Sequence, residues 1–168
     1  MKKLTTRELV TFAILACIMF VSKQALAALP NIHLLALLIT AYTIKYRAKA
    51  LIPLYIYVLL EGIFAGFAYW WVPYLYIWTV LWAIVMLASS LKIPKAWQVP
   101  TYMIICGLHG LFFGMLYAPA QALIFGLNFP EMVAWIVAGF PFDVIHGIGD
   151  FAAGSLVIPL VNVLNRAD

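Results

Sequence analysis

The chain has 168 residues, of which 67% are hydrophobic and 10% are charged, with a formal net charge of +4. Soluble globular proteins contain about 45–50% apolar and about 25% charged residues, so this composition excludes an ordinary soluble domain and favours a membrane protein. The positive charge does not indicate a nucleic-acid partner, because the basic residues flank apolar segments and fit the anionic headgroups of membrane lipids better.

Long apolar segments predict an all-α membrane protein, a bundle of six membrane-spanning helices in a single domain, because about 20 helical residues cross the ~30 Å hydrocarbon core. In chain order the predicted spans cover residues 8–29, 33–44, 50–68, 75–91, 100–118 and 141–165. The second span is short enough to be tilted or packed inside the protein. Pro119 is expected to end or kink the fifth span. Gly139 and Pro141 divide the last stretch, so we expect a short interfacial helix over residues 130–138 before the sixth span.

The Lys and Arg residues alternate between connectors, as the positive-inside rule predicts for a multi-pass protein. They lie before the first span, after the second and fourth spans, and after the sixth: Lys2, Lys3, Arg7, Lys45, Arg47, Lys49, Lys92, Lys95 and Arg166. The connectors over residues 30–33, 69–74 and 119–130 contain no Lys or Arg. We therefore expect both termini in the cytoplasm and these three connectors outside. Lys23 alone lies within a predicted span.

The sixth span carries three ionisable residues, Asp143, His146 and Asp150, and their spacing places them on one helical face. Ionisable side chains are costly inside a membrane and usually mark a functional site. Two interpretations are open: a binding face, or a helix cap at Asp143 with interhelical hydrogen bonds from the other two. We favour the binding face, because three ionisable groups on one stripe exceed what packing requires.

Further polar residues lie at the same predicted outer end: Lys23, Asn31, His33, Glu61 and His109. An ion pair between Lys23 and an acid would offset two buried charges and could be purely structural. A ligand contact by Glu61 is equally open. His109 stands alone in its helix, where a histidine more often packs than binds a ligand.

The connector after the third span is rich in aromatic residues, among them Trp70, Trp71 and Tyr74, with Trp78 following in the next span. Trp and Tyr are common at membrane interfaces, so an aromatic belt is one explanation. Their concentration on one connector beside convergent acids favours another, the stacking of a planar polar small molecule.

Three segments, residues 29–34 (LPNIHL), 57–62 (YVLLEG) and 140–150 (FPFDVIHGIGD), resemble the substrate-binding (S) component of an energy-coupling factor (ECF) transporter, a vitamin importer. The resemblance extends over the whole chain, in its size, its span number, its short second span and its polar outer end. It implies a multi-pass subunit of a bacterial cell membrane that binds substrate near the outer face. The connector after the third span would form part of a lid.

The resemblance also implies protein partners. An S component docks on a transmembrane coupling subunit (T component) and rotates in the membrane to release substrate, and two ATPase subunits reset the complex. Family members dock through an Ala-xxx-Ala spacing on the first span, which here becomes Ala13 and Cys17, a small-xxx-small spacing. The chain has no Walker-type phosphate loop, so partner subunits would supply ATP hydrolysis.

We therefore expect a transport subunit, not an enzyme, without cofactor or metal, whose ligand is a small heteroaromatic vitamin. The acids, histidines and aromatic rings favour a vitamin B6 form, with thiamine or a nicotinate-like compound (niacin) as alternatives. Two other classes stay open. Asp143, His146 and Asp150 could be metal ligands of an intramembrane enzyme, completed from a second helix by His109 or Glu61. A structural membrane-assembly protein would bind no ligand.

Overall fold

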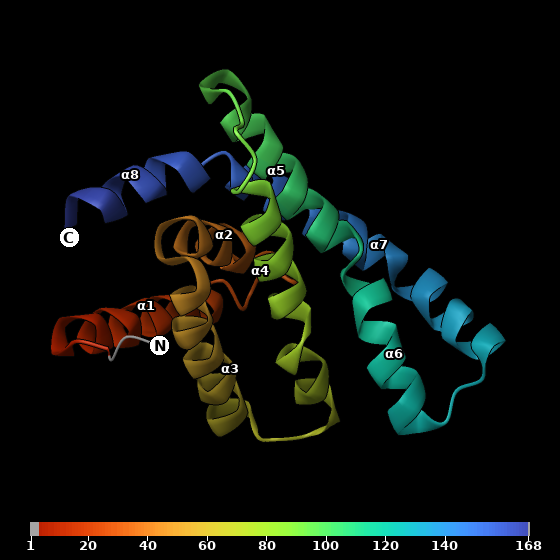
Figure 1. The fold of residues 1–168 in the computed structure, drawn as a ribbon. Helices are drawn as coiled ribbons and strands as arrows, with labels where there is room; N and C mark the ends of the chain where they lie inside the picture. The colour runs from red at the N-terminus through yellow and green to blue at the C-terminus, as the bar shows by residue number, and fades with distance from the viewer. Residues whose placement is uncertain (1–3, 168) are drawn as a thin grey trace.

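The computed structural model describes residues 4–167, and over these residues every regular element is a helix (Figure 1). Lys2 and Lys3 of the topology prediction lie outside the described residues. In chain order the elements are α1 (Thr6–Ala25), α2 (Leu35–Tyr46), the 3₁₀ helix η1 (Arg47–Ala50), α3 (Leu51–Ala65), the 3₁₀ helix η2 (Tyr69–Leu75), α4 (Ile77–Ala88), α5 (Lys95–Leu111), α6 (Phe113–Phe125), α7 (Phe129–Gly154) and α8 (Val157–Ala167). The predicted all-helical fold class is confirmed.

Within the described residues, five helical stretches are long and apolar enough to cross a membrane: Thr6–Ala25, Leu35–Ala65, Tyr69–Ala88, Lys95–Phe125 and Phe129–Gly154. Three of them join consecutive elements: α2 with η1 and α3, η2 with α4, and α5 with α6. α8 has 11 residues and is too short to cross the hydrocarbon core alone, because a helix rises only about 1.5 Å per residue. The chain is therefore an all-helical, membrane-embedded protein.

α2 lies at the centre of the molecule. Its residues from Leu35 to Thr43 are all buried, and it contacts α1, α4, α5, α7 and α8. A helix that is apolar all round is stable inside a packed core, so α2 matches the packed-inside alternative for the second span. At Arg47 the backbone adopts a φ of 56°, which ends α2 before η1 and α3 begin.

α7 differs from the predicted boundaries. It runs without interruption through Gly139 and Pro141 and ends at Gly154. The separate interfacial helix over residues 130–138 is therefore not formed, and the prediction of a break at Gly139 is wrong. Proline is tolerated in membrane helices because neighbouring groups satisfy the carbonyl that it leaves unpaired.

A capping box sets the start of α7. The Asn128 side-chain oxygen accepts the N–H of Glu131 at 3.0 Å, and Glu131 Oε2 accepts the N–H of Asn128 at 2.8 Å. Two of the unpaired donors at the helix start are thereby satisfied. The helix thus has its own start signal at Asn128, well before Gly139, where its break was expected.

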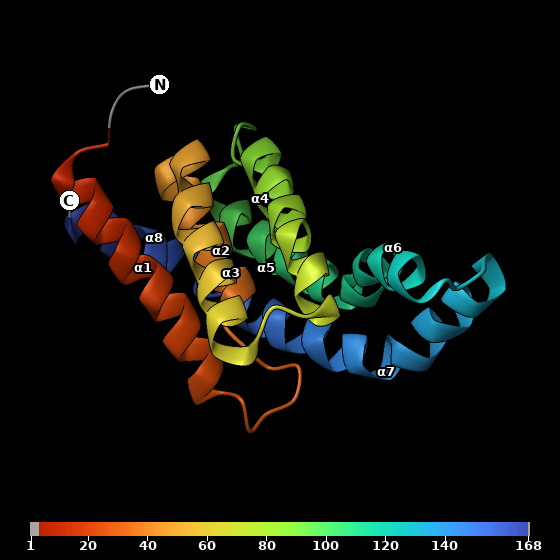
Figure 2. The ribbon, with the colours of Figure 1, turned by 90° about the horizontal axis from the view of Figure 1, so that it is seen from below.

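The fifth predicted span is also divided at a different place. α5 ends at Leu111 and α6 begins at Phe113, whereas Pro119 lies inside α6. Helical bonding resumes at once, because the N–H of Leu116 donates to the carbonyl of Phe112 at 3.0 Å. Figures 1 and 2 show α6 and the first half of α7 extending together away from α1 to α4.

The basic connectors gather at one end of the molecule. Lys49 in η1 pairs with Glu8 in the first turn of α1, and Arg47 donates to Ser90 Oγ at 3.1 Å just after α4. Lys92 and Arg47 line the same surface pocket in this region. In both views the start of α1 and the end of α8 lie on the same side of the molecule (Figures 1 and 2).

The close approach of α7 to α5 yields a stability prediction. A Cβ on Gly154 would lie 2.7 Å from Met103 Cα and 3.2 Å from the carbonyl oxygen of Tyr102, and both are backbone atoms. We expect Gly154→Ala to cost about 1–3 kcal/mol through overpacking, measured as a lower thermal unfolding midpoint in detergent.

Gly139→Ala on the same helix is the matched control. No atom lies within 4 Å of the position that its Cβ would take, and alanine favours the helix by up to about 1 kcal/mol over glycine. Its unfolding midpoint should therefore be unchanged or higher. Equal midpoints for the two variants would contradict the close contact between α5 and α7.

Candidate functional site

A cavity of about 350 Å³ opens at the end of the molecule opposite to the basic connectors. It lies between the last turns of α1 and α3, the connector before α2, η2, and the adjoining parts of α6 and α7. Six of the predicted site residues line it together: Lys23, Asn31, His33, Glu61, Tyr74 and His146. These residues are distant in sequence, so the fold brings them together.

Lys23 and Glu61 form an ion pair in the cavity wall. The Glu61 side chain is 2% exposed and that of Lys23 is 26% exposed, so the lysine reaches the more open edge. Lys23 Nζ also lies 5.3 Å from the ring centroid of Tyr74, within the range of a cation–π contact. Glu61 is therefore the acid that partners Lys23, and the pair both offsets two buried charges and lines the cavity.

His33 meets two of the α7 residues beside the cavity. Its Nδ1 lies 3.8 Å from Asp150 Oδ1, and His146 Nε2 lies 3.2 Å from Asp150 Oδ2. The two imidazole rings are 4.5 Å apart between their centroids. These four atoms are buried, and none is aligned for a hydrogen bond with any described residue. Buried polar atoms are normally satisfied, so this cluster is a candidate contact site for a ligand.

His33 precedes the apolar stretch that begins at Leu35. Burial lowers the pKa of its imidazole to about 3, and the nearby His146 and Lys23 act in the same direction. The His33 ring is therefore neutral at pH 7. A neutral imidazole carries one N–H donor and one bare nitrogen acceptor.

Asp143 has a different environment from that of His146 and Asp150. Each of its carboxylate oxygens lies 3.2 Å from the N–H of Gly114, in the first turn of α6. A carboxylate at this place satisfies an unpaired helix N–H and is favoured by the helix dipole. A Cβ at Gly114 would collide with the carboxylate, so this approach requires glycine. The cap considered for Asp143 exists, but on α6 instead of its own helix.

A second layer of polar and aromatic groups lies behind the cavity. Trp78 is fully buried, with its ring 5.9 Å from that of His33 and 5.6 Å from that of His109. His109 Nε2 lies 3.2 Å from the carbonyl oxygen of Ile77, which is the packing contact expected for a lone histidine. His109 Nδ1 and Trp78 Nε1 have no partner among the described residues.

The aromatic connector forms η2, and its residues divide between support and cavity wall. Trp71 Nε1 donates to the carbonyl of Val58 at 2.7 Å and anchors η2 on α3. The Tyr74 ring lies edge-on to Trp70 and to Trp78, each at 5.6 Å. Tyr74 lines the cavity, and the tryptophans hold it in place.

Phe113 and Tyr57 are among the residues at the site that were not predicted. Phe113 lines the cavity, with its ring 4.9 Å from that of His146. Tyr57 has a buried hydroxyl without a partner among the described residues. Its spacing of four residues from Glu61 places both on one face of α3, which is a signal that could have identified it. Phe113 stands in an apolar run and carries no such signal.

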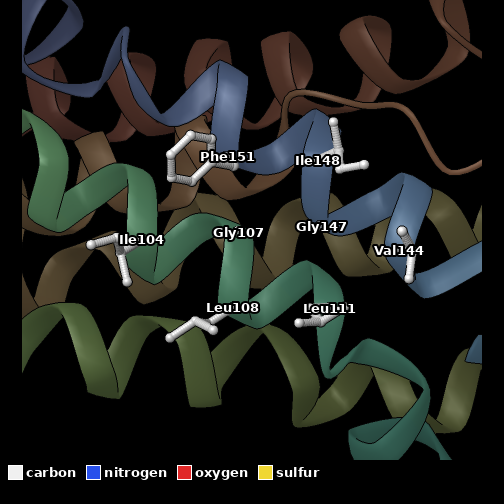
Figure 3. Close-up of a pocket in the computed structure, with 8 residues that line it drawn as sticks. All are labelled: Ile104, Gly107, Leu108, Leu111, Val144, Gly147, Ile148 and Phe151. Atoms are coloured by element: carbon white, nitrogen blue, oxygen red, sulfur yellow. The ribbon is translucent and has the colours of Figure 1, made fainter.

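Two other hollows in the surface are apolar. Figure 3 shows one of about 330 Å³ where α5 crosses α7 near Gly107 and Gly147, with hydrocarbon side chains around it. The other is a groove on α1 beside Ala13 and Cys17, both exposed, which we call the small-residue face. Neither offers the polar groups that surround the cavity beside Lys23 and Glu61.

No family model, curated protein or solved structure matches the chain. Its class is defined by the fold and the composition, as an all-helical protein embedded in a membrane. The described residues also form a polar cavity at one end.

The cap on α6 gives a prediction for Asp143. We expect Asp143→Ala to lower the free energy of unfolding by about 1 kcal/mol, because the N–H of Gly114 loses its acceptor. Asp143→Asn keeps a side-chain oxygen and should retain most of the stability, since Asn and Asp are similar caps. Unfolding in detergent measures both variants. Equal losses would show that the negative charge of Asp143 matters and that its capping oxygen does not.

Proposed function

We propose that the chain is the substrate-binding subunit of an ECF-type importer in a bacterial cell membrane, and that its cavity captures a small heteroaromatic vitamin. The proposal is carried by the buried polar atoms at and behind the cavity that lack partners among the described residues. They are His33 Nδ1, Tyr57 Oη, Trp78 Nε1, His109 Nδ1, His146 Nε2 and both carboxylate oxygens of Asp150. Unsatisfied buried groups cost free energy, so a ligand that bonds to them gains affinity.

The shape and chemistry of the cavity support this class of ligand. Its volume of about 350 Å³ lies in the range of about 300–1,000 Å³ typical of small-molecule pockets. Tyr74 and Phe113 provide aromatic rings for stacking, and Lys23 with Glu61 provides charges of both signs. A planar ring with hydroxyl or cationic groups suits these partners. We favour a vitamin B6 form, with thiamine or a nicotinate-like compound as alternatives.

The proposed topology has six spans and both termini in the cytoplasm. It counts α2 and α3 as separate spans that meet at Arg47, and α7 with α8 as the last span. The gathering of Lys49, Arg47 and Lys92 at the end opposite to the cavity supports it under the positive-inside rule. The cavity then faces the outside, where a captured nutrient enters.

We assign transport, not catalysis, to this chain. A T component and two ATPase subunits would be its partners, and the small-residue face of Ala13 and Cys17 on α1 would be the docking surface. Both residues are exposed, and small residues allow helices to approach closely in a membrane. Rotation of the docked subunit would then deliver the substrate to the inside.

Ligand binding to detergent-purified protein tests the proposal. We expect a vitamin B6 form to raise the thermal unfolding midpoint, because a ligand at 100 times its Kd stabilises the folded state by about 2.7 kcal/mol. Glu61→Gln and His146→Ala should each weaken binding at least about tenfold, or about 1.4 kcal/mol, in calorimetric titration.

Glu8→Gln is the matched control for Glu61→Gln. It removes the acid of another ion pair that ties α1 to the α2–α3 region, at the end opposite to the cavity, and should leave ligand affinity unchanged. If no compound of a vitamin panel shifts the midpoint, the proposed function is wrong. If Glu8→Gln weakens binding as much as Glu61→Gln, the cavity is not the binding site.

A further inference from the structure

The geometry points to a binding site for a divalent transition-metal ion, formed by His33, His146 and Asp150 beside the cavity. Two imidazole nitrogens and a carboxylate oxygen are ligands that zinc and similar ions prefer. The site needs only these three side chains. It shares these side chains with the proposed vitamin site, but its test does not require that the transport function be correct.

The spacing of the ligand atoms fits one ion. The nitrogens of His33 and His146 and a carboxylate oxygen of Asp150 all lie within 4.8 Å of one another. Ligands held about 2.0–2.2 Å from a tetrahedral ion are about 3.4 Å apart. His146 Nε2 lies 3.2 Å from Asp150 Oδ2, and His33 Nδ1 lies 3.8 Å from the other oxygen, Oδ1. The carboxylate therefore lies next to both imidazole rings, at separations close to those that one ion requires.

The same atoms have no hydrogen-bond partner among the described residues. His33 Nδ1, His146 Nε2 and both oxygens of Asp150 are buried without a hydrogen bond, and a single cation would satisfy the two nitrogens and one of the oxygens. The neighbouring positive charge of Lys23 does not oppose this, because Glu61 pairs with it. Asp143, which the sequence grouped with His146 and Asp150, is instead bound to Gly114.

The positions of the ligands give the site an open side. His146 and Asp150 lie one turn apart on α7 and face the same way, while His33 comes from the connector before α2. Three protein ligands leave a fourth position free, as in zinc sites that bind an exchangeable group. His33 and His146 line the cavity, so the free position would face it and accept a water or an electron-pair donor of a small molecule.

Metal binding to the unmodified protein is the first test. The protein is purified with a tag that contains no histidine, stripped with a chelator, and titrated with Zn²⁺ and with Cu²⁺. We expect one ion per chain, and a Cu²⁺ electron paramagnetic resonance spectrum with nitrogen splitting from two imidazoles. Substoichiometric binding, or a spectrum without two nitrogen ligands, would overturn the proposal even if no variant could be purified.

Variants then locate the site. His33→Gln, His146→Gln and Asp150→Asn should each weaken Zn²⁺ binding at least about tenfold, since the loss of even an outer-shell partner costs 10–100-fold. His109→Gln is the matched control. It is the third of the three histidines, it is 4% exposed against 3% for His146, and it lies outside the cluster. An equal loss in His109→Gln would overturn the assignment, and metal-free unfolding midpoints show that each variant is folded.

Measurements of vitamin binding and of metal binding together separate a failure of the metal site from a failure of the proposed function. Vitamin binding that persists in chelator-stripped protein, together with no stoichiometric metal binding, overturns the metal site and leaves the transport proposal standing. Stoichiometric metal binding that depends on His33, His146 and Asp150, with no vitamin bound, supports the metal site and refutes the vitamin.

Discussion

The burial of α2 is the constraint on which the rest of the structure depends. α2 has 12 residues, about 18 Å of helix, so as a separate span it is shorter than a hydrocarbon core of ~30 Å and depends on the helices around it. It is apolar on all sides and must be enclosed by other helices, which here are α1, α4, α5, α7 and α8. Because α2 begins at Leu35 in this interior position, the residues just before it are drawn inward as well. His33 thereby lies in the cavity lining, next to Asp150 of α7.

The enclosure of α2 explains how a polar cluster forms inside an apolar protein. α7 packs tightly on α5, and a Cβ on Gly110 would come within 3.0 Å of both Asp150 Oδ2 and the backbone of Gly147. α5 therefore covers one side of the Asp150 carboxylate, while His146 and His33 cover the other. The carboxylate of Asp150 is therefore shielded from lipid. The two histidines, which line the cavity, lie between it and the cavity. Buried ionisable groups in this position are typical of functional sites in membrane proteins, because packing alone does not require them.

Local sequence pattern predicted the features that depend on composition and helical spacing. The apolar content predicted membrane helices, and spacings of three and four residues placed His146 and Asp150 on one face. The pattern failed where distant segments decide the outcome. Pro141 did not break α7, since in a membrane an interrupted helix would expose more unsatisfied peptide groups than the proline itself leaves. The partner of Asp143 is Gly114 on another helix, and the place of His33 beside Asp150 follows from the packing of α2 and α7, so neither is visible in the spacing of residues.

α1 connects the two ends of the molecule and has two distinct sides. Ion pairs hold it at both ends, Glu8 with Lys49 near the basic connectors and Lys23 with Glu61 at the cavity. Between them one side of α1 is buried in the core, and the small-residue face points away from it. A partner could therefore pack on that face without displacing the core. Any shift of α1 on docking would act on the cavity wall through Lys23 and Glu61, a connection that a transport subunit requires and a static assembly protein does not.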